Sequence, residues 1–141
     1  MKAESNLEKV LTAGEFAVTA ELGPPANANP DAVTKKAAYC AGIVDAANVT
    51  DNQTAVVRMS SIAASTIALQ SGVEPVVQMV CRDRNRIAMQ SDLLGASALG
   101  LKNILCLAGD HQTFGNHPGA KGVYDLDSIQ LVSMLKKMRD D

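Results

Sequence analysis

Aromatic residues are scarce in this 141-residue sequence, which has two Tyr, two Phe and no Trp. Its core must therefore be filled by Ala, Val, Leu, Ile and six Met, small or flexible side chains that favour close packing of helices on strands. A large excess of one charge is also missing, since the sequence has 13 basic and 15 acidic residues. The formal net charge of -2 gives no reason to expect nucleic acid or an anionic membrane as a partner.

Paired cysteines and targeting segments are missing as well. The three cysteines, Cys40, Cys81 and Cys106, form an odd set without CxxC spacing. This argues against a disulfide framework or a zinc knuckle and indicates a reducing compartment. The N-terminal stretch MKAESNLEKVLTAG contains no long apolar run, so it is expected to be neither a signal peptide nor a membrane span. We therefore predict a cytoplasmic protein that does not enter a membrane.

Four short apolar runs, rich in β-branched residues, indicate strands because each is too short to be a good isolated helix. The runs are FAVTAEL (16–22), IVDAANVT (43–50), EPVVQMVC (74–81) and NILCLAG (103–109). Each is followed by a stretch with helical periodicity, at 29–41, 60–72, 84–100 and 126–138. The strands begin roughly every 30 residues, the length of one βα unit. The sequence thus predicts four βα units in a single domain, residues 1–141.

Residues at the predicted boundaries agree with this order. Asn29 before Pro30 is typical of a helix N-cap with proline at the first helical position. Gly72 and Gly100 lie where a helix C-terminus favours glycine. Strands with nearly continuous apolar character predict a parallel sheet that is covered on both faces. Two architectures suit four such units, a doubly wound open sheet and a (β/α)8 barrel.

Polar residues cluster where the predicted strands end, and this favours the barrel, whose active sites lie at the carboxyl ends of the strands. They are Glu21; Thr50, Asp51 and Asn52; Gln78, Arg82 and Asp83; and Asp110 and His111. No GxGxxG or GxxxxGK[ST] follows any of the runs, so neither a Rossmann nor a P-loop phosphate site is indicated.

Glu21 ends an apolar run directly before Gly23, Pro24 and Pro25. Burial at the end of a strand would raise its pKa and keep it protonated, as a general acid requires. The adjacent prolines would form a rigid turn and fix its direction. The alternative is a glutamate at the rim of the sheet, paired with a neighbouring base.

The ends of the four runs together resemble the methylenetetrahydrofolate reductase family. The motifs AELGPP, NVTDN, VVQMVCRDRNR and ILCLAGDH occur in the family's order and at similar spacing, over nearly the whole chain. The resemblance implies a (β/α)8 barrel that binds FAD and reduces 5,10-methylenetetrahydrofolate to 5-methyltetrahydrofolate, in one-carbon metabolism and methionine biosynthesis. NAD(P)H or another electron donor would reduce the flavin.

The resemblance also implies roles for individual residues. Glu21 matches the acid that is thought to supply the proton for opening the folate's imidazolidine ring. Asp110 matches an aspartate near flavin and pterin that influences folate binding and flavin potential. Thr50 matches a threonine that contacts flavin, and Gln78 stands where many members have a histidine near the cofactor. Ala108 occupies a position where many members have an arginine, and it is also expected to contact the flavin.

A complete barrel takes about 250 residues, so we expect this chain to supply the first four βα units. Alone it is expected to be inactive, to bind FAD weakly or not at all, and to self-associate as a homo-oligomer. Two other functions stay open: a non-catalytic half-barrel module for assembly or binding, and a pterin-binding methyltransferase barrel without flavin.

Two further clusters are open to interpretation. His111 and His117 share the glycine-rich loop 109–122 with Asp110, but their spacing matches no standard metal motif, and we predict no metal. The basic residues Arg82, Arg84 and Arg86 precede or begin a helix. They are expected to form a solvated face or, alternatively, an electropositive rim for a polyanionic ligand.

Overall fold

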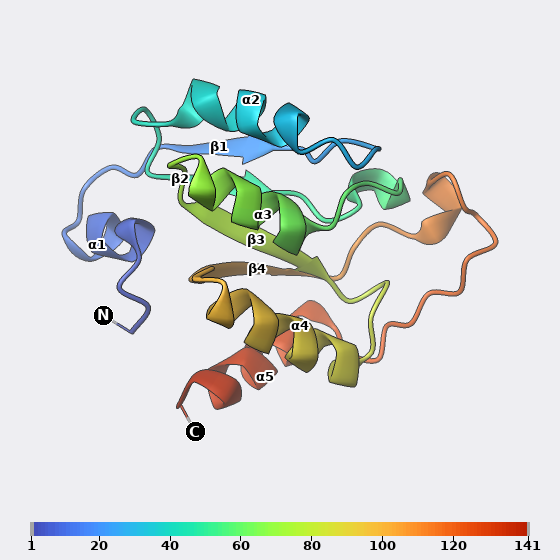
Figure 1. The fold of residues 1–141 in the computed structure, drawn as a ribbon. Helices are drawn as coiled ribbons and strands as arrows, with labels where there is room; N and C mark the ends of the chain where they lie inside the picture. The colour runs from blue at the N-terminus through green and yellow to red at the C-terminus, as the bar shows by residue number, and fades with distance from the viewer. Residues whose placement is uncertain (1, 141) are drawn as a thin grey trace.

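The computed structural model describes residues 2–140, which fold into a four-stranded parallel sheet with helices between the strands (Figure 1). The strands are β1 (Thr19–Leu22), β2 (Ala46–Val49), β3 (Pro75–Val80) and β4 (Asn103–Leu107). Their order in the sheet is β1-β2-β3-β4, so each strand lies beside the one before it in the chain. All four predicted strands are confirmed, each shorter than its apolar run.

The four predicted helices are confirmed as α2 (Pro30–Cys40), α3 (Ser61–Gln70), α4 (Arg86–Ala98) and α5 (Ser128–Asp140). The side chain of Asn29 caps α2 by accepting a 2.9 Å hydrogen bond from the Asp31 N–H. Gly72 and Gly100 follow α3 and α4 with φ of +83°, the left-handed conformation that favours glycine at a helix end. No helix within residues 2–140 has the length and apolar character needed to cross a membrane.

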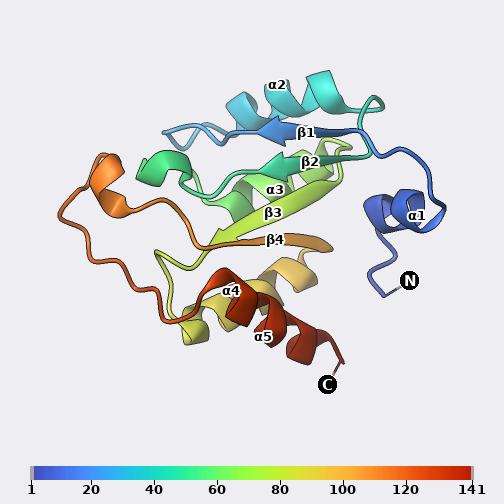
Figure 2. The same cartoon turned by 180° about the vertical axis from the view of Figure 1, so that it is seen from behind.

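A fifth helix, α1 (Asn6–Thr12), was not predicted from the sequence. Ser5 caps it by accepting from the Glu8 N–H, and the Glu74 carboxylate accepts from the N–H groups of Asn6 and Leu7. Because Glu74 directly precedes β3, these bonds place α1 at the amino ends of the strands (Figure 2). A seven-residue helix held by capping bonds has too little apolar periodicity to be recognised in the sequence.

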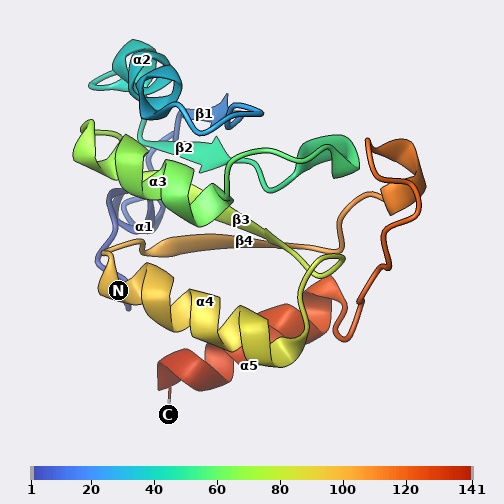
Figure 3. The same cartoon turned by 45° about the vertical axis from the view of Figure 1, so that its right-hand side comes forward.

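Helices α2 to α5 cover one face of the sheet, as Figures 1 and 3 show. The side chains that enter the core on this face include Leu22, Val49, Val77 and Met79. A doubly wound sheet reverses its strand order and carries helices on both faces. The unreversed order and the one-sided helices therefore agree with part of a (β/α) barrel, whereas closure into eight strands remains a prediction.

The opposite face of the sheet is partly polar, which corrects the expectation that both faces are covered and apolar. The strand register places Glu21 beside Asn48, and Gln78 beside Leu105. Glu21 and Leu105 are exposed, while Asn48 and Gln78 are half-buried. In Figure 2 this face lies towards the viewer and no helix crosses it. Polar side chains on this face can therefore meet a ligand.

Candidate functional site

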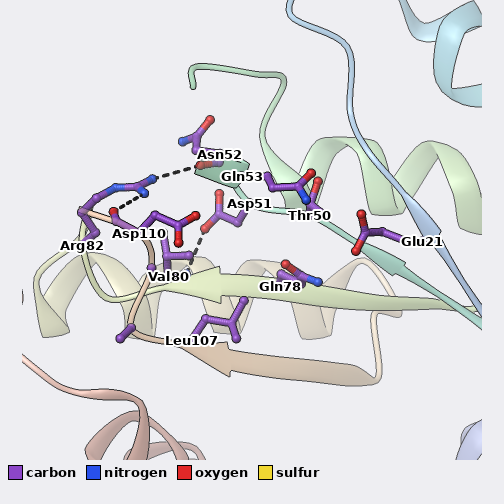
Figure 4. A pocket seen from close by; sticks show the side chains of 12 residues that line it. Glu21, Thr50, Asp51, Asn52, Gln53, Gln78, Val80, Arg82, Leu107 and Asp110 are labelled. Carbon is purple, nitrogen blue, oxygen red and sulfur yellow. Dashed lines mark hydrogen bonds between the residues drawn. The ribbon is translucent and has the colours of Figure 1, made fainter. Parts of the chain in front are cut away.

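A cleft of about 340 Å³ lies at the carboxyl ends of the strands (Figure 4). Its lining consists of Glu21, Thr50, Asp51, Asn52, Gln53, Gln78, Val80, Arg82, Leu107, Ala108, Gly109 and Asp110. All five predicted site residues, Glu21, Thr50, Gln78, Ala108 and Asp110, are therefore brought together from four strand ends. Their roles stay predictions, but their convergence follows directly from the parallel order of the sheet.

Glu21 lies on the open face of the edge strand β1, and its side chain is exposed. The expectation that burial protonates it is wrong for the described structure, because β1 has a neighbour on one side only and no helix covers this face. The alternative of a paired rim glutamate is not met either, since Glu21 forms no ion pair within residues 2–140. The carboxylate is thus free to contact a ligand.

The turn after Glu21 is held rigidly, as its prolines predict. Pro24 is fully buried, and its carbonyl accepts a 3.3 Å hydrogen bond from Arg58 Nη1. The carbonyl of Gly23 accepts a 2.6 Å hydrogen bond from Lys36 Nζ. The backbone that follows Glu21 is therefore fixed from two directions, which limits how far the acid can move from the cleft.

Thr50 and Gln78 supply polar atoms to the wall of the cleft. Thr50 is 2% exposed, and its Oγ1 has no hydrogen-bond partner within the described residues. A buried hydroxyl without a partner costs about 1–3 kcal/mol, so a ligand that bonds to it would recover this energy. Gln78 projects from β3 into the same space and offers both an amide donor and an acceptor (Figure 4).

Asp110 stands on the loop after β4 with its carboxylate exposed in the cleft. Its Oδ2 accepts a 3.0 Å hydrogen bond from the Thr54 N–H. Gly109 has φ of +91°, and a Cβ added there would meet the Cβ of Val80 at 3.0 Å. Glycine at this position therefore lets the end of β4 pass close to β3 and turn Asp110 into the cleft.

Two loops form the wall beyond the strand ends. The first contains η1 (Gln53–Ala55) and the second contains η2 (Gln112–Phe114). Asn116 Oδ1 accepts a 3.1 Å hydrogen bond from the Val57 N–H, and a Cβ added at Gly115 would lie 1.8 Å from the Ala55 carbonyl oxygen. Only glycine permits this contact, so the long glycine-rich loop is fastened to its neighbour.

The arginines after β3 differ from the predicted solvated face. Arg82 is 3% exposed, and the hydrogen bond from its guanidinium to Asp83 raises its pKa. Arg84 reaches the buried Asp51, with 2.7 Å between Nη1 and Oδ2. Arg86 alone is well exposed, and it pairs with Asp125. The adjacent Arg82 and Asp83 were the available signal for the first of these ion pairs, whereas the partners of Arg84 and Arg86 lie elsewhere in the chain.

Asp51 was noted only as one of several polar residues at the strand ends, and its structural role was missed. It is 3% exposed, and its Oδ2 accepts a 3.0 Å hydrogen bond from the Val80 N–H as well as the bond from Arg84. The carboxylate thus joins the ends of β2 and β3 at the wall of the cleft. Because Oδ2 accepts two hydrogen bonds and Oδ1 accepts a third from Arg84 Nη2 at 3.4 Å, the main role of Asp51 is to hold the wall in place.

The two histidines do not form a metal site with their neighbours. His111 Nδ1 lies 2.8 Å from Thr113 Oγ1, within its own loop. In the part of the chain from 2 to 140, no three His, Cys, Asp or Glu side chains gather closely enough to hold a metal ion.

A comparison of the sequence with models of known protein families identifies one matching family. The model of the family described as methylenetetrahydrofolate reductase matches residues 6–141. No curated protein matches the sequence.

Proposed function

The chain belongs to the methylenetetrahydrofolate reductase family, and from this premise we propose that its cleft serves the flavin-dependent reduction of 5,10-methylenetetrahydrofolate to 5-methyltetrahydrofolate. Membership supports a folate-linked one-carbon reductase. The observation that carries the finer assignment is the convergence of Glu21, Thr50, Gln78 and Asp110 on one cleft. NAD(P)H or another donor would supply the electrons.

The residues of the cleft fit the ring system of a flavin. The hydroxyl of Thr50 is buried without a partner among residues 2–140, and Gln78 offers an amide that can match a heterocyclic donor and acceptor edge. The small residues Ala108 and Gly109 leave room for a planar group. A volume of about 340 Å³ is at the low end for ligand sites, about 300–1,000 Å³, so the described residues suit one ring system at a time.

Flavin, when bound, supplies the hydride chemistry of this reaction. Glu21 would hold the proton that the folate's leaving ring nitrogen takes up as the imidazolidine ring opens. Its exposed carboxylate would contact the substrate directly. The rigid turn at Pro24 keeps this donor in place.

Asp110 would hold the pterin and influence the flavin. A carboxylate accepts hydrogen bonds from the amide and amino groups of a pterin edge. Its negative charge also disfavours an anionic reduced flavin beside it. Asp110 Oδ1 carries no hydrogen bond within residues 2–140, whereas Oδ2 is occupied by the Thr54 N–H. One oxygen is thus available to a ligand while the other fixes the side chain.

Amide chemical-shift mapping tests the proposal, since it detects weak as well as tight binding. FAD and 5-methyltetrahydrofolate, each added at up to millimolar concentration, should shift the resonances of Glu21, Thr50, Gln78 and Asp110. Shifts with folate but not with FAD would indicate the pterin-binding methyltransferase instead. The absence of shifts with either ligand would favour the non-catalytic module.

A matched pair of variants makes the test specific to the unpartnered hydroxyl. Thr50→Val keeps the shape of the side chain and should weaken FAD binding by about tenfold. Thr66→Val is the control, because Thr66 Oγ1 already donates to the Ile62 carbonyl within α3 and lies outside the cleft. Equal effects of the two substitutions on FAD binding would contradict the role of Thr50.

A further inference from the structure

We propose that Arg82 is a positioning residue that aims the Asp110 carboxylate into the cleft. The functional consequence of this assignment rests on the proposed function, in which Asp110 binds folate. The positioning itself depends only on contacts within the chain.

The guanidinium of Arg82 joins the ends of three strands. From the end of β3, its Nη1 donates a 2.8 Å hydrogen bond to the backbone carbonyl of Asp110, after β4. Its Nη2 donates to the backbone carbonyl of Asn52, after β2, at 3.3 Å. The Arg82 backbone N–H also donates to the Ala108 carbonyl at 3.1 Å. One residue therefore sets the spacing between the two loops that form the wall of the cleft.

Asp83 pairs with the Arg82 guanidinium and offsets the positive charge of that group. Its two carboxylate oxygens accept from Arg82 Nε and Nη2, each at 2.7 Å, and Asn52 Nδ2 donates to it at 3.3 Å. Burial alone would raise the pKa of Asp83, but the hydrogen bonds and charge of Arg82 hold it below its usual range. The pair is thus ionised and nearly neutral overall, with each Arg82 guanidinium nitrogen already bonded.

This arrangement decides between two roles for Arg82. An anion-binding arginine needs free donors and an uncompensated charge, whereas four of the five guanidinium N–H groups of Arg82 are bonded within the chain and Asp83 offsets its charge. It acts instead through geometry, because fixing the Asp110 carbonyl fixes the backbone from which the carboxylate projects. The bond between Asp110 Oδ2 and the Thr54 N–H then restricts the side chain and leaves Oδ1 towards the ligand. Both ends of Asp110 are thereby anchored.

The experiment compares backbone order and folate affinity in the full chain. Arg82→Gln combined with Asp83→Asn removes both partners of the pair, so that no buried charge is left uncompensated. We expect the amide order parameters of Thr54 and Asp110 to fall from about 0.85 to below about 0.6. Affinity for 5-methyltetrahydrofolate should fall by about tenfold. Order within β3, at Val77 and Met79, should not change.

Two single variants keep the test decisive. Arg82→Lys retains the charge facing Asp83 and so protects the fold, but it cannot reach both carbonyls, and it should restore part of the order at Asp110. Arg86→Gln is the matched control, because Arg86 lies four residues later on the surface and pairs with Asp125. Its order parameters and affinity should stay at the wild-type values.

The outcomes separate the two proposals. Unchanged order at Asp110 in the Arg82 variants would overturn the positioning role, whether or not the affinity falls. If order falls as expected but the wild-type chain binds no folate, positioning by Arg82 stands and the proposed function fails. Reduced order together with wild-type folate affinity would also overturn the positioning role of Arg82, because the orientation of the Asp110 carboxylate would then not matter for folate binding.

Discussion

The buried carboxylate of Asp51 and the partly exposed guanidinium of Arg84 form an ion pair at the wall of the cleft, with 2.7 Å between Oδ2 and Nη1. Burial lowers the pKa of Arg84, but the charge of Asp51 and its hydrogen bonds outweigh this effect and raise it. Arg84 also contacts Asp92 of α4 at 3.0 Å. The pair therefore links the end of β2 to the helix that follows β3.

Asp51→Asn is expected to destabilise the fold more than any surface substitution of an acid. The change removes the buried carboxylate that faces Arg84 and leaves the more exposed Asp92 as its ionic partner, which is expected to cost about 2 kcal/mol. Urea unfolding followed by circular dichroism measures this loss. Asp125→Asn is the control, because its partner Arg86 lies on the surface. If both variants unfold at the same urea concentration, the pair of Asp51 and Arg84 does not stabilise the chain as argued.

Asp125 should contribute to the loss of stability in acid. The side-chain hydrogen bonds from Arg86, followed by its backbone N–H, lower the pKa of Asp125 from 3.8 to about 2. A carboxylate whose pKa is lower in the folded state stabilises the fold above its unfolded pKa, and this contribution is lost as pH falls through the folded pKa. The window thus lies between about pH 4 and pH 2.

Thermal unfolding at a series of pH values tests this assignment. Asp125→Asn should flatten the dependence of the melting temperature on pH within that window, because the titrating group is gone. Asp31→Asn, at an exposed aspartate without an ion pair among residues 2–140, should leave the dependence as in the wild type. Parallel curves for Asp125→Asn and the wild type would contradict the role of Asp125.

The four strands and the main helices could be predicted because they depend on local signals. Apolar runs, an Asn29 cap and glycines after the helices each act within a few residues of chain. The convergence of the site followed from one rule of parallel sheets, which places all the carboxyl ends at one edge. Given that rule, Glu21 and Asp110 meet in the same cleft although they lie far apart in the sequence.

Burial and polar partners could not be predicted in the same way. Glu21 was expected to be buried, but exposure depends on which elements cover a strand, and its edge position leaves it open. Arg82 was expected to be solvated, yet besides the adjacent Asp83 it bonds to two carbonyls on loops 30 and 28 residues away in the chain. Neither fact has a local signature in the sequence. Residue type gives the chemistry of a side chain, whereas packing decides what the side chain meets.

Glu21→Gln is expected to separate the two half-reactions of the proposed enzyme. Glutamine keeps the shape of the side chain but has no acidic proton to give, so folate reduction in the full-length, flavin-loaded enzyme should fall by about 10²-fold or more. Reduction of the flavin by the electron donor should stay close to the wild-type rate. Stopped-flow absorbance at the flavin band measures both steps, and equal losses in the two would remove Glu21 from the role of proton donor.

The free edges of the sheet predict self-association of the chain. Within residues 2–140, β1 pairs only with β2 and β4 only with β3, so each edge strand presents unpaired backbone groups. Leu105 on β4 adds an apolar side chain that is 39% exposed on the open face. The simplest arrangement that covers such edges is a two-fold dimer, and stable interfaces of this kind bury about 800 Å² per partner.

Light scattering at micromolar concentration should therefore give the mass of a dimer. Leu105→Lys places a charge beside the free edge of β4 and should shift the equilibrium towards monomer. Ile87→Lys is the matched control, since Ile87 is an exposed apolar residue in the first turn of α4, away from the open face, and the dimer should persist. A wild-type monomer at these concentrations would show that the open edges are tolerated in water. Dissociation by both substitutions alike would place the interface elsewhere, because only Leu105 stands on an edge strand.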